Sequence, residues 1–474
     1  MRSGVVICLS VGDPGRARQA QVWASASVPI ITTMEPHPIR LTVADDLVRS
    51  RLTVFFRILL AIPHFIWIFL WGIAVLVVAI LSWFIVLFTA RLPKGLHGFQ
   101  SAYVRYSTHL GAYVFLAANP YPGFTGDQEE NRYPISLQID EPTRQNRWKT
   151  AFRIVLALPA VLLSSALGSI AFGGGSGGSY QSESQRGSDQ AWVYLADQLS
   201  VALVVALLGW WVCVALGRMP MGFRDLVAYC LRYSAQALGY VLFLTDRYPS
   251  SDPYDPAATQ PTPEKPIRIG VGDDLRRSRL TVFFRGLLTL PHLVWLSLWS
   301  IAVFFALIAA WFATLVTGTL PSALHRFIAA YVRYLTHVFA FLFIVANPFP
   351  GFTGTAGSYE VDLAIGGPER QNRWKTAFRA VLVVPAYAVH GMLGGPFFLV
   401  GVFGWFVGLF LGRMPEGLRN LGAYYLRYTG QTYGYLYLLT DSYPCAGPSD
   451  YVAPAEPEPE ALPAWPDAPV SPSF

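Results

Sequence analysis

Arginine recurs six residues before a proline at four places in the chain, each at the start of a long apolar run. A guanidinium there can contact a lipid phosphate or another anion, or it can act as a structural anchor whose long side chain reaches the headgroups. A proline in the same stretch removes a backbone hydrogen bond and bends a helix. The sequence therefore predicts four kinked helices, each with one candidate anion-binding arginine. The pairs are Arg57 and Pro63, Arg153 and Pro159, Arg285 and Pro291, and Arg379 and Pro385.

No motif of a known reaction accompanies these arginines. The sequence has no Walker loop, no nucleophile elbow and no HExxH, which are the usual signs of nucleotide, acyl-transfer and zinc chemistry. His97 and His109 lie about 120° out of register on a helix, so they do not form a metal-binding pair. The cysteines show neither CxxC spacing nor a pairing pattern. We therefore expect no enzyme activity, no catalytic residue, no cofactor and no metal.

The composition is that of a membrane protein. Hydrophobic residues make up 53% of the 474 residues and charged residues only 14%, which is far more apolar than a soluble domain needs. The net charge of +6 comes from basic residues that flank apolar runs and do not cluster with exposed aromatics. We interpret them as topology signals and expect no nucleic acid partner. The predicted fold class is an all-α polytopic membrane protein.

Four repeated units, arranged A-B-A-B, make up most of the chain. Units one and three share SRLTVFFR and AYVRY, whereas units two and four share QNRWKTAFR, GRMP, LRY and LTD. Duplication of a pair of units explains this order. The predicted boundaries are residues 36–132, 133–248, 265–357 and 358–444, with a disordered or wrongly assigned N-terminal extension at 1–35, a Pro-rich linker at 249–264 and a disordered Pro-rich acidic tail at 445–474.

Each unit is expected to form a transmembrane hairpin of two helices. Residues 58–90 contain no Lys, Arg, Asp or Glu, and one helix of that length would extend about 50 Å, whereas a bilayer core is about 30 Å thick. A turn near Trp71 and Gly72 would give two spans that fit. A Gly-rich polar insert at 173–190 separates two apolar runs in unit two. In unit four the same place is marked by Gly391, Gly394, Gly395 and Pro396.

Two further kinds of element flank each predicted hairpin. Short alternating runs at 38–43, 134–139, 266–271 and 359–365 are strand-like by their period of two, and we expect them at the cytoplasmic rim. A third segment follows each hairpin, and its apolar stripe and tyrosines indicate an amphipathic helix in the membrane interface, with a third span as the alternative. Basic residues on both flanks of every hairpin predict a multi-pass protein of the cell membrane with both termini cytoplasmic.

Gly404, Gly408 and Gly412 recur every four residues in the apolar run of unit four. Unit two has small residues at the same spacing, Gly209, Cys213 and Gly217. Small residues at such intervals let two helices approach closely. We therefore predict a helix-packing face here, with a pore-lining role as the alternative.

The ordered set of SRLTVFFR, a long apolar run, GRMP, LRY and LTDRYP resembles the bacterial membrane family catalogued as domain of unknown function 4389. The resemblance extends over residues 36–444 as tandem copies and implies fold and location. Because the family's function is not established, the resemblance implies no catalytic residue. We expect a non-enzymatic membrane scaffold or lipid-interacting accessory protein, with membrane lipids, a second copy or another membrane protein as partners. The alternative is a transporter or channel built from duplicated halves, which needs a polar cavity at mid-membrane depth.

Overall fold

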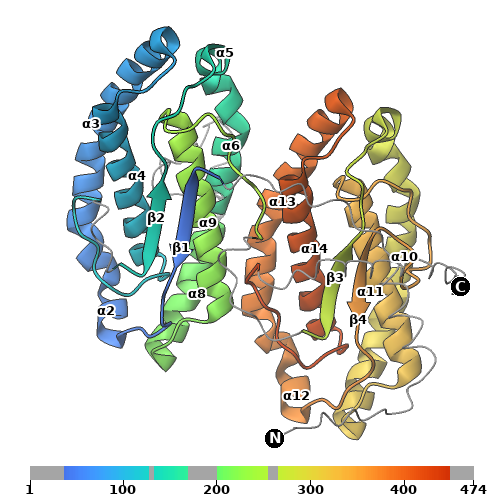
Figure 1. Cartoon of the computed structure of the whole chain (residues 1–474). Coiled ribbons are helices and arrows are strands. Elements are labelled where there is room, and N and C mark those ends of the chain that lie inside the picture. The colour runs from blue at the N-terminus through green and yellow to red at the C-terminus, as the bar shows by residue number, and fades with distance from the viewer. Residues whose placement is uncertain (1–36, 127–132, 169–199, 255–264, 449–474) are drawn as a thin grey trace, which may run out of the picture.

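The computed structural model describes residues 37–126, 133–168, 200–254 and 265–448 (Figure 1). Each unit begins with a strand, continues into a long apolar helix and ends with a helix of 21 residues. The predicted helical class is therefore confirmed. The strands are β1 (Ile39–Val43), β2 (Ile135–Ile139), β3 (Ile267–Val271) and β4 (Val361–Ile365). The 21-residue helices are α4 (Lys94–Val114), α9 (Met221–Val241), α11 (Ser322–Leu342) and α14 (Glu416–Leu436).

The long apolar helices run without the predicted turn, so the hairpin expected in units one, three and four is wrong. The long helix of unit one is continuous through Trp71 and Gly72. A Cβ at Gly72 would lie 3.4 Å from the hydroxyl of Tyr103, at ordinary contact distance. The long helices and the short helices that lead into them are α2 (Arg51–Phe55), α3 (Arg57–Thr89), α10 (Arg279–Thr317), α12 (Arg373–Leu382) and α13 (Val384–Leu411). In unit four the expected turn residues Gly391, Gly394, Gly395 and Pro396 all lie inside α13.

Unit two has the same plan with an interruption. Its long helix is divided into α6 (Arg153–Leu167) and α8 (Val201–Leu216), led by α5 (Arg147–Ala151). The two parts meet end to end, because a Cβ at Gly168 would lie only 2.5 Å from the hydroxyl oxygen of Ser200. The turn expected for this unit falls at residues outside those that the structure describes.

The true hairpin joins each long helix to the 21-residue helix that follows it. A four-residue turn connects them, and in every unit the first turn residue has a left-handed backbone, which terminates the helix. Glycine holds this position in three units, but Ala90 holds it in unit one with a φ of 58°. The three glycines are Gly217, Gly318 and Gly412. Gly412, predicted to pack two helices, thus ends α13 instead.

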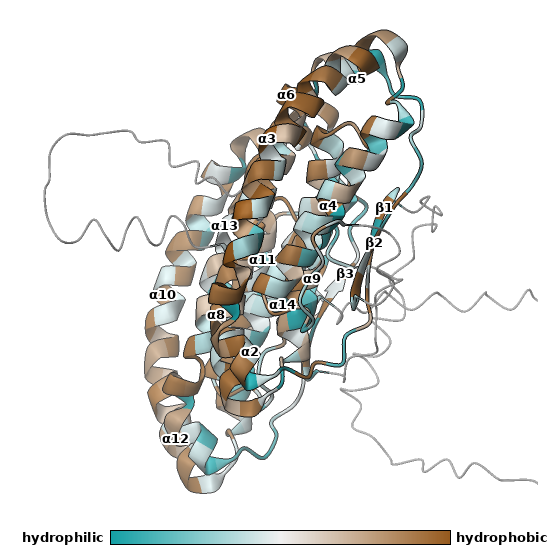
Figure 2. Cartoon of the chain, turned by 90° about the vertical axis from the view of Figure 1, so that its left-hand side faces the viewer, coloured by the Kyte–Doolittle hydropathy of each residue, from teal (hydrophilic) through white to brown (hydrophobic). Residues whose placement is uncertain are grey.

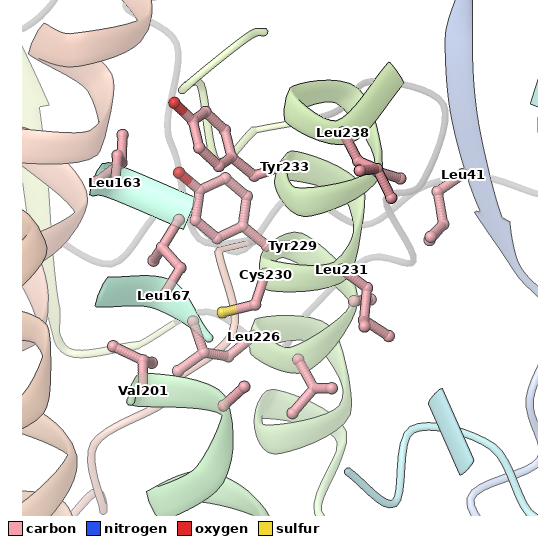
Figure 3. Packing of buried hydrophobic residues seen from close by; sticks show 14 of the residues in the cluster. Leu41, Leu163, Leu167, Val201, Leu226, Tyr229, Cys230, Leu231, Tyr233 and Leu238 are labelled. Carbon is pink, nitrogen blue, oxygen red and sulfur yellow. The ribbon is translucent and has the colours of Figure 1, made fainter. Parts of the chain in front are cut away.

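The elements form three layers, which Figure 2 shows from the side. We call α3, α6, α8, α10 and α13 the long-helix layer, and α4, α9, α11 and α14 the middle layer. The strands cover the opposite side of the middle layer and form the third layer. Figure 3 shows this for α9, where Leu231 and Leu238 point toward Leu41 of β1, while Tyr229 points toward Leu163 of α6 on the other side.

Burial between two layers corrects the predicted interfacial position of the 21-residue helices. In α14, Tyr424, Tyr428 and Tyr435 are at most 2% exposed. These tyrosines therefore pack inside the protein, whereas an interfacial helix would expose them to headgroups. The helices were recognised correctly from their stripe, but the sequence did not reveal the strand layer that covers their second face.

The strands pair in two separate antiparallel sheets, β1 with β2 and β3 with β4. Leu41 pairs with Leu137 at the centre of the first sheet, so units one and two are related by a pseudo-two-fold axis there. The same relation is visible in the turns. The amide of Arg49 donates to Gly217 O of unit two, and that of Gln145 donates to Ala90 O of unit one.

The two halves of the molecule meet through their B units. Helix α13 contacts both α6 and α8, and the amide of Asn420 donates to a carboxylate oxygen of Asp252 across the junction (2.7 Å). The units therefore lie in a row in the order one, two, four, three, as Figure 1 shows. Helices α3 and α10 form the two ends of this row.

Candidate functional site

The four predicted arginines perform one structural task in all four units. Arg57 Nη1 donates to the carbonyl oxygens of Tyr113 (2.7 Å) and Ala118 (3.0 Å), where the middle-layer helix ends. Unpaired carbonyls and the helix dipole make this end favourable for a cation, and the guanidinium also lies 4.4 Å from the ring centre of Tyr113. The equivalent bonds run from Arg153 to Tyr240 and Thr245, from Arg285 to Phe341 and Ala346, and from Arg379 to Tyr435 and Thr440.

The side chain that completes each arginine site differs between A and B units. Asp246 accepts from Arg153 at 2.7 Å in unit two, and Asp441 accepts from Arg379 at 2.8 Å in unit four. Asn119 takes this place in unit one, 3.3 Å from Arg57. All four arginines are only 1–2% exposed, so the geometry favours structural anchoring over contact with a lipid phosphate. The lipid-phosphate contact stays a prediction.

A second buried arginine lies beside the first in each A unit. Arg49 pairs with Asp45 at 2.7 Å and donates to Leu116 O, and Arg277 repeats this with Asp273. Sequence reasoning missed these pairs. The repeated string DDL-x-R at residues 45–49 and 273–277 was the available signal, since acid and base four residues apart can pair in a turn.

Three buried histidines have a polar side-chain partner. His64 and His292 bond to Tyr106 and Tyr334 at 2.7 Å, and His337 Nε2 lies 2.8 Å from Asp362 Oδ1. Burial lowers the pKa of His109 to about 4, so this ring is neutral at pH 7. Among the described residues no three His, Cys, Asp or Glu gather into a group that could hold a metal ion.

The predicted proline and glycine features are placed as follows. Pro63, Pro159 and Pro291 lie inside α3, α6 and α10, and Pro385 is the second residue of α13. The helix interruptions fall at Phe56, Phe152 and Val383, ahead of the prolines. A Cβ at Gly404 would lie 3.0 Å from the side chain of Met414, in the turn that follows α13. A Cβ at Gly408 would lie 3.4 Å from Val282 of α10 in unit three, so only Gly408 lies at a contact between two helices.

The outer face of the long-helix layer exposes many apolar side chains. Three of its helices are long and apolar enough to cross a membrane, which indicates that the protein associates with one. The buried positions of α3, such as Ala61, Val75 and Val86, face α4. The opposite side of α3 is exposed and apolar throughout, with Leu59, Ile62, Ile66, Leu70, Ile73, Leu76, Ile80, Phe84 and Phe88.

Basic and aromatic residues surround this apolar face at both ends of the helices. Trp148 and Trp374 are 76% and 75% exposed, and each stacks on an exposed phenylalanine one turn further on. Such amphipathic rings favour the headgroup level of a bilayer. The exposed basic residues at the helix ends are Arg51, Arg91, Lys94, Arg147, Lys149, Arg218, Arg276, Arg279, Arg370, Arg373, Lys375 and Arg413.

The repeats and the exposed apolar layer define a membrane-associated helical repeat protein. The family model described as "Domain of unknown function (DUF4389)" matches residues 51–125, 191–251, 279–353 and 373–446. These tandem matches cover more than half of the chain, so the protein belongs to this family, as its sequence motifs predict. Neither a curated protein nor a solved structure matches the chain.

Proposed function

We propose that the protein is a non-enzymatic membrane scaffold or lipid-interacting accessory protein of the cell membrane, with both termini cytoplasmic. Its partners in this proposal are membrane lipids and either a second copy of the chain or another membrane protein. The observation that carries the proposal is the continuous apolar outer face of the long-helix layer. Apolar patches of this extent on a folded protein mark contact with lipid or with another protein.

The interior of the long helices supports a structural role more than transport. Between their first and last turns, the described parts of these helices carry no acidic residue. The buried arginines donate hydrogen bonds to helix carbonyls of the protein itself and are not available to a substrate. A transporter needs polar groups that a substrate can reach at mid-membrane depth, and we therefore do not propose transport.

Membrane fractionation with matched variants tests this proposal. The intact protein should stay with the membrane pellet after a carbonate wash and leave it only in detergent. Replacing Leu59, Ile66, Ile73 and Ile80 together with Lys places charges on the apolar face and should release most of the protein. The control changes Thr42 and Gln138 on the exposed side of the strands to Lys and should stay in the pellet. Release of the intact protein by carbonate would contradict the proposal.

A further inference from the structure

We infer that the protein lies flat on one leaflet of an anionic phospholipid bilayer, with the long-helix layer embedded in the membrane plane and the strand layer in water. This inference rests on the proposed membrane association and specifies its geometry. In this orientation the long apolar helices lie parallel to the membrane and do not cross the bilayer, although they are long enough to do so. Four independent features of the structure support it.

The first feature is helix length. Helix α3 has 33 residues and α10 has 39, which correspond to about 50 Å and about 58 Å. To fit the apolar part of α3 into a core of about 30 Å, the helix would have to tilt by more than about 50°, beyond the usual range of 0–40°. A helix in the plane of the interface meets no such limit.

The second feature is the position of the strands. Figure 1 shows both sheets near the middle of the helix length, where a spanning orientation would place the centre of the bilayer. Within the part of the chain that the structure describes, both sheets have two strands, so each strand has one unpaired edge. The ion pair of Arg40 and Asp140 is exposed on this layer. Open sheet edges and exposed ion pairs are not tolerated in hydrocarbon. In the flat orientation this layer faces water.

The third feature is the interruption of unit two. The break lies halfway along the long helix, between 15 residues of α6 and 16 residues of α8. The sequence between them is Gly-rich and polar and includes Glu183, Arg186 and Asp189. A spanning orientation would place the described residues on either side of this charged sequence, Gly168 and Ser200, at the bilayer centre. An in-plane orientation places Gly168 and Ser200 near the headgroups, where neighbouring charged residues cost far less.

The fourth feature is the symmetry of charge. Arg51 begins α2, which leads into α3. Arg91 and Lys94 follow the other end of α3, where they adjoin the basic start of unit two. A spanning helix would then place a basic cluster on both sides of the membrane, against the positive-inside pattern. A flat molecule presents both clusters to the same leaflet. Anionic headgroups attract such basic clusters electrostatically.

The test is the reaction of single cysteines with a membrane-impermeant maleimide in intact and permeabilised cells. Cys8 and Cys445 are first replaced with Ser, whereas Cys213 and Cys230 are buried and can stay. Four probes are introduced separately: Ser50→Cys and Gly95→Cys at the two ends of α3, Thr42→Cys on the strand layer, and Ile73→Cys in the middle of the apolar face. Gly98→Cys replaces Gly95→Cys if that variant does not accumulate, since both positions have open space for a side chain.

The flat orientation predicts that Ser50→Cys, Gly95→Cys and Thr42→Cys all react from the same side, and that Ile73→Cys reacts only after detergent is added. Reaction of Ser50→Cys and Gly95→Cys from opposite sides would overturn the inference and leave membrane association intact. Reaction of Ile73→Cys with external reagent would also overturn it, in favour of a spanning hairpin. If the protein appears in the soluble fraction, the proposed function itself fails.

Discussion

At the scale of single residues, the repeated arginine is best explained as an internal cap. Its two short bonds to helix-end carbonyls recur in all four units with nearly the same distances. A buried guanidinium that satisfies otherwise unpaired carbonyls stabilises the fold, and a smaller neutral side chain leaves them desolvated. The sequence identified these arginines by spacing alone. It could not show that their partners lie 56 to 61 residues further on in unit one.

Replacing Arg285 with Gln should therefore lower the free energy of unfolding by about 2–4 kcal/mol, because the carbonyls of Phe341 and Ala346 lose a charged donor. Unfolding in detergent micelles, followed by circular dichroism, measures this change. The matched control is Arg326→Gln at an exposed position, which should change stability by less than about 0.5 kcal/mol. Equal effects of the two substitutions would contradict the capping role.

Ala90, which has a left-handed backbone at the end of α3, predicts a substitution that raises the free energy of unfolding. Ala90→Gly should stabilise the protein by about 0.5–1 kcal/mol, because glycine adopts this backbone without steric cost and the other units use glycine here. Ala74→Gly, at an exposed position inside α3, should destabilise by about 1 kcal/mol. If Ala74→Gly were neutral or stabilising, residue 74 would not be in a continuous helix.

At the scale of elements, the long helices show where sequence reasoning succeeded and where it failed. The strands and the 21-residue helices could be predicted because alternation and an apolar stripe are local signals. The predicted hairpin was wrong because an apolar run does not by itself show whether the helix continues straight or the chain turns back. A turn is required by the bilayer thickness only if the apolar run spans the membrane. Glycines near the middle of an apolar run can mark a turn, but glycine inside a helix also permits close contact with a neighbour.

Two glycines of α13 separate these roles. Gly391 has open space around its missing Cβ, whereas a Cβ at Gly401 would lie 2.5 Å from the ring of Phe343. Gly391→Ala should therefore stabilise the protein by about 0.5–1 kcal/mol through helix propensity. Gly401→Ala should destabilise it by about 1–3 kcal/mol through overpacking. Chemical unfolding of both variants in the same detergent measures the two changes in free energy. A loss of stability in Gly391→Ala would contradict a continuous helix at this residue and favour a turn there.

At the scale of the whole molecule, internal symmetry accounts for the architecture. Each half is a pseudo-dimer of one A unit and one B unit. A two-stranded sheet joins the two units, as do backbone hydrogen bonds between the turn of one unit and the helix start of the other. The two halves meet through their B units. The A-B-A-B order in the sequence predicted the duplication. It could not predict the row order one, two, four, three, because that order depends on which helix faces are complementary. The exposed apolar layer on one side and polar strands on the other follow from this arrangement.

The depth of spin labels along α3 in anionic vesicles tests the account most directly. Labels are attached singly at Leu59, Ile66, Ile73, Ile80 and Phe88, all on the exposed apolar side, and their accessibility to oxygen and to a polar nickel complex gives their depth. The flat orientation predicts nearly the same depth, about 5–10 Å below the headgroups, at all five positions. A profile that is shallow at Leu59 and Phe88 and deepest near Ile73 would mean that the helix spans, and would contradict the account.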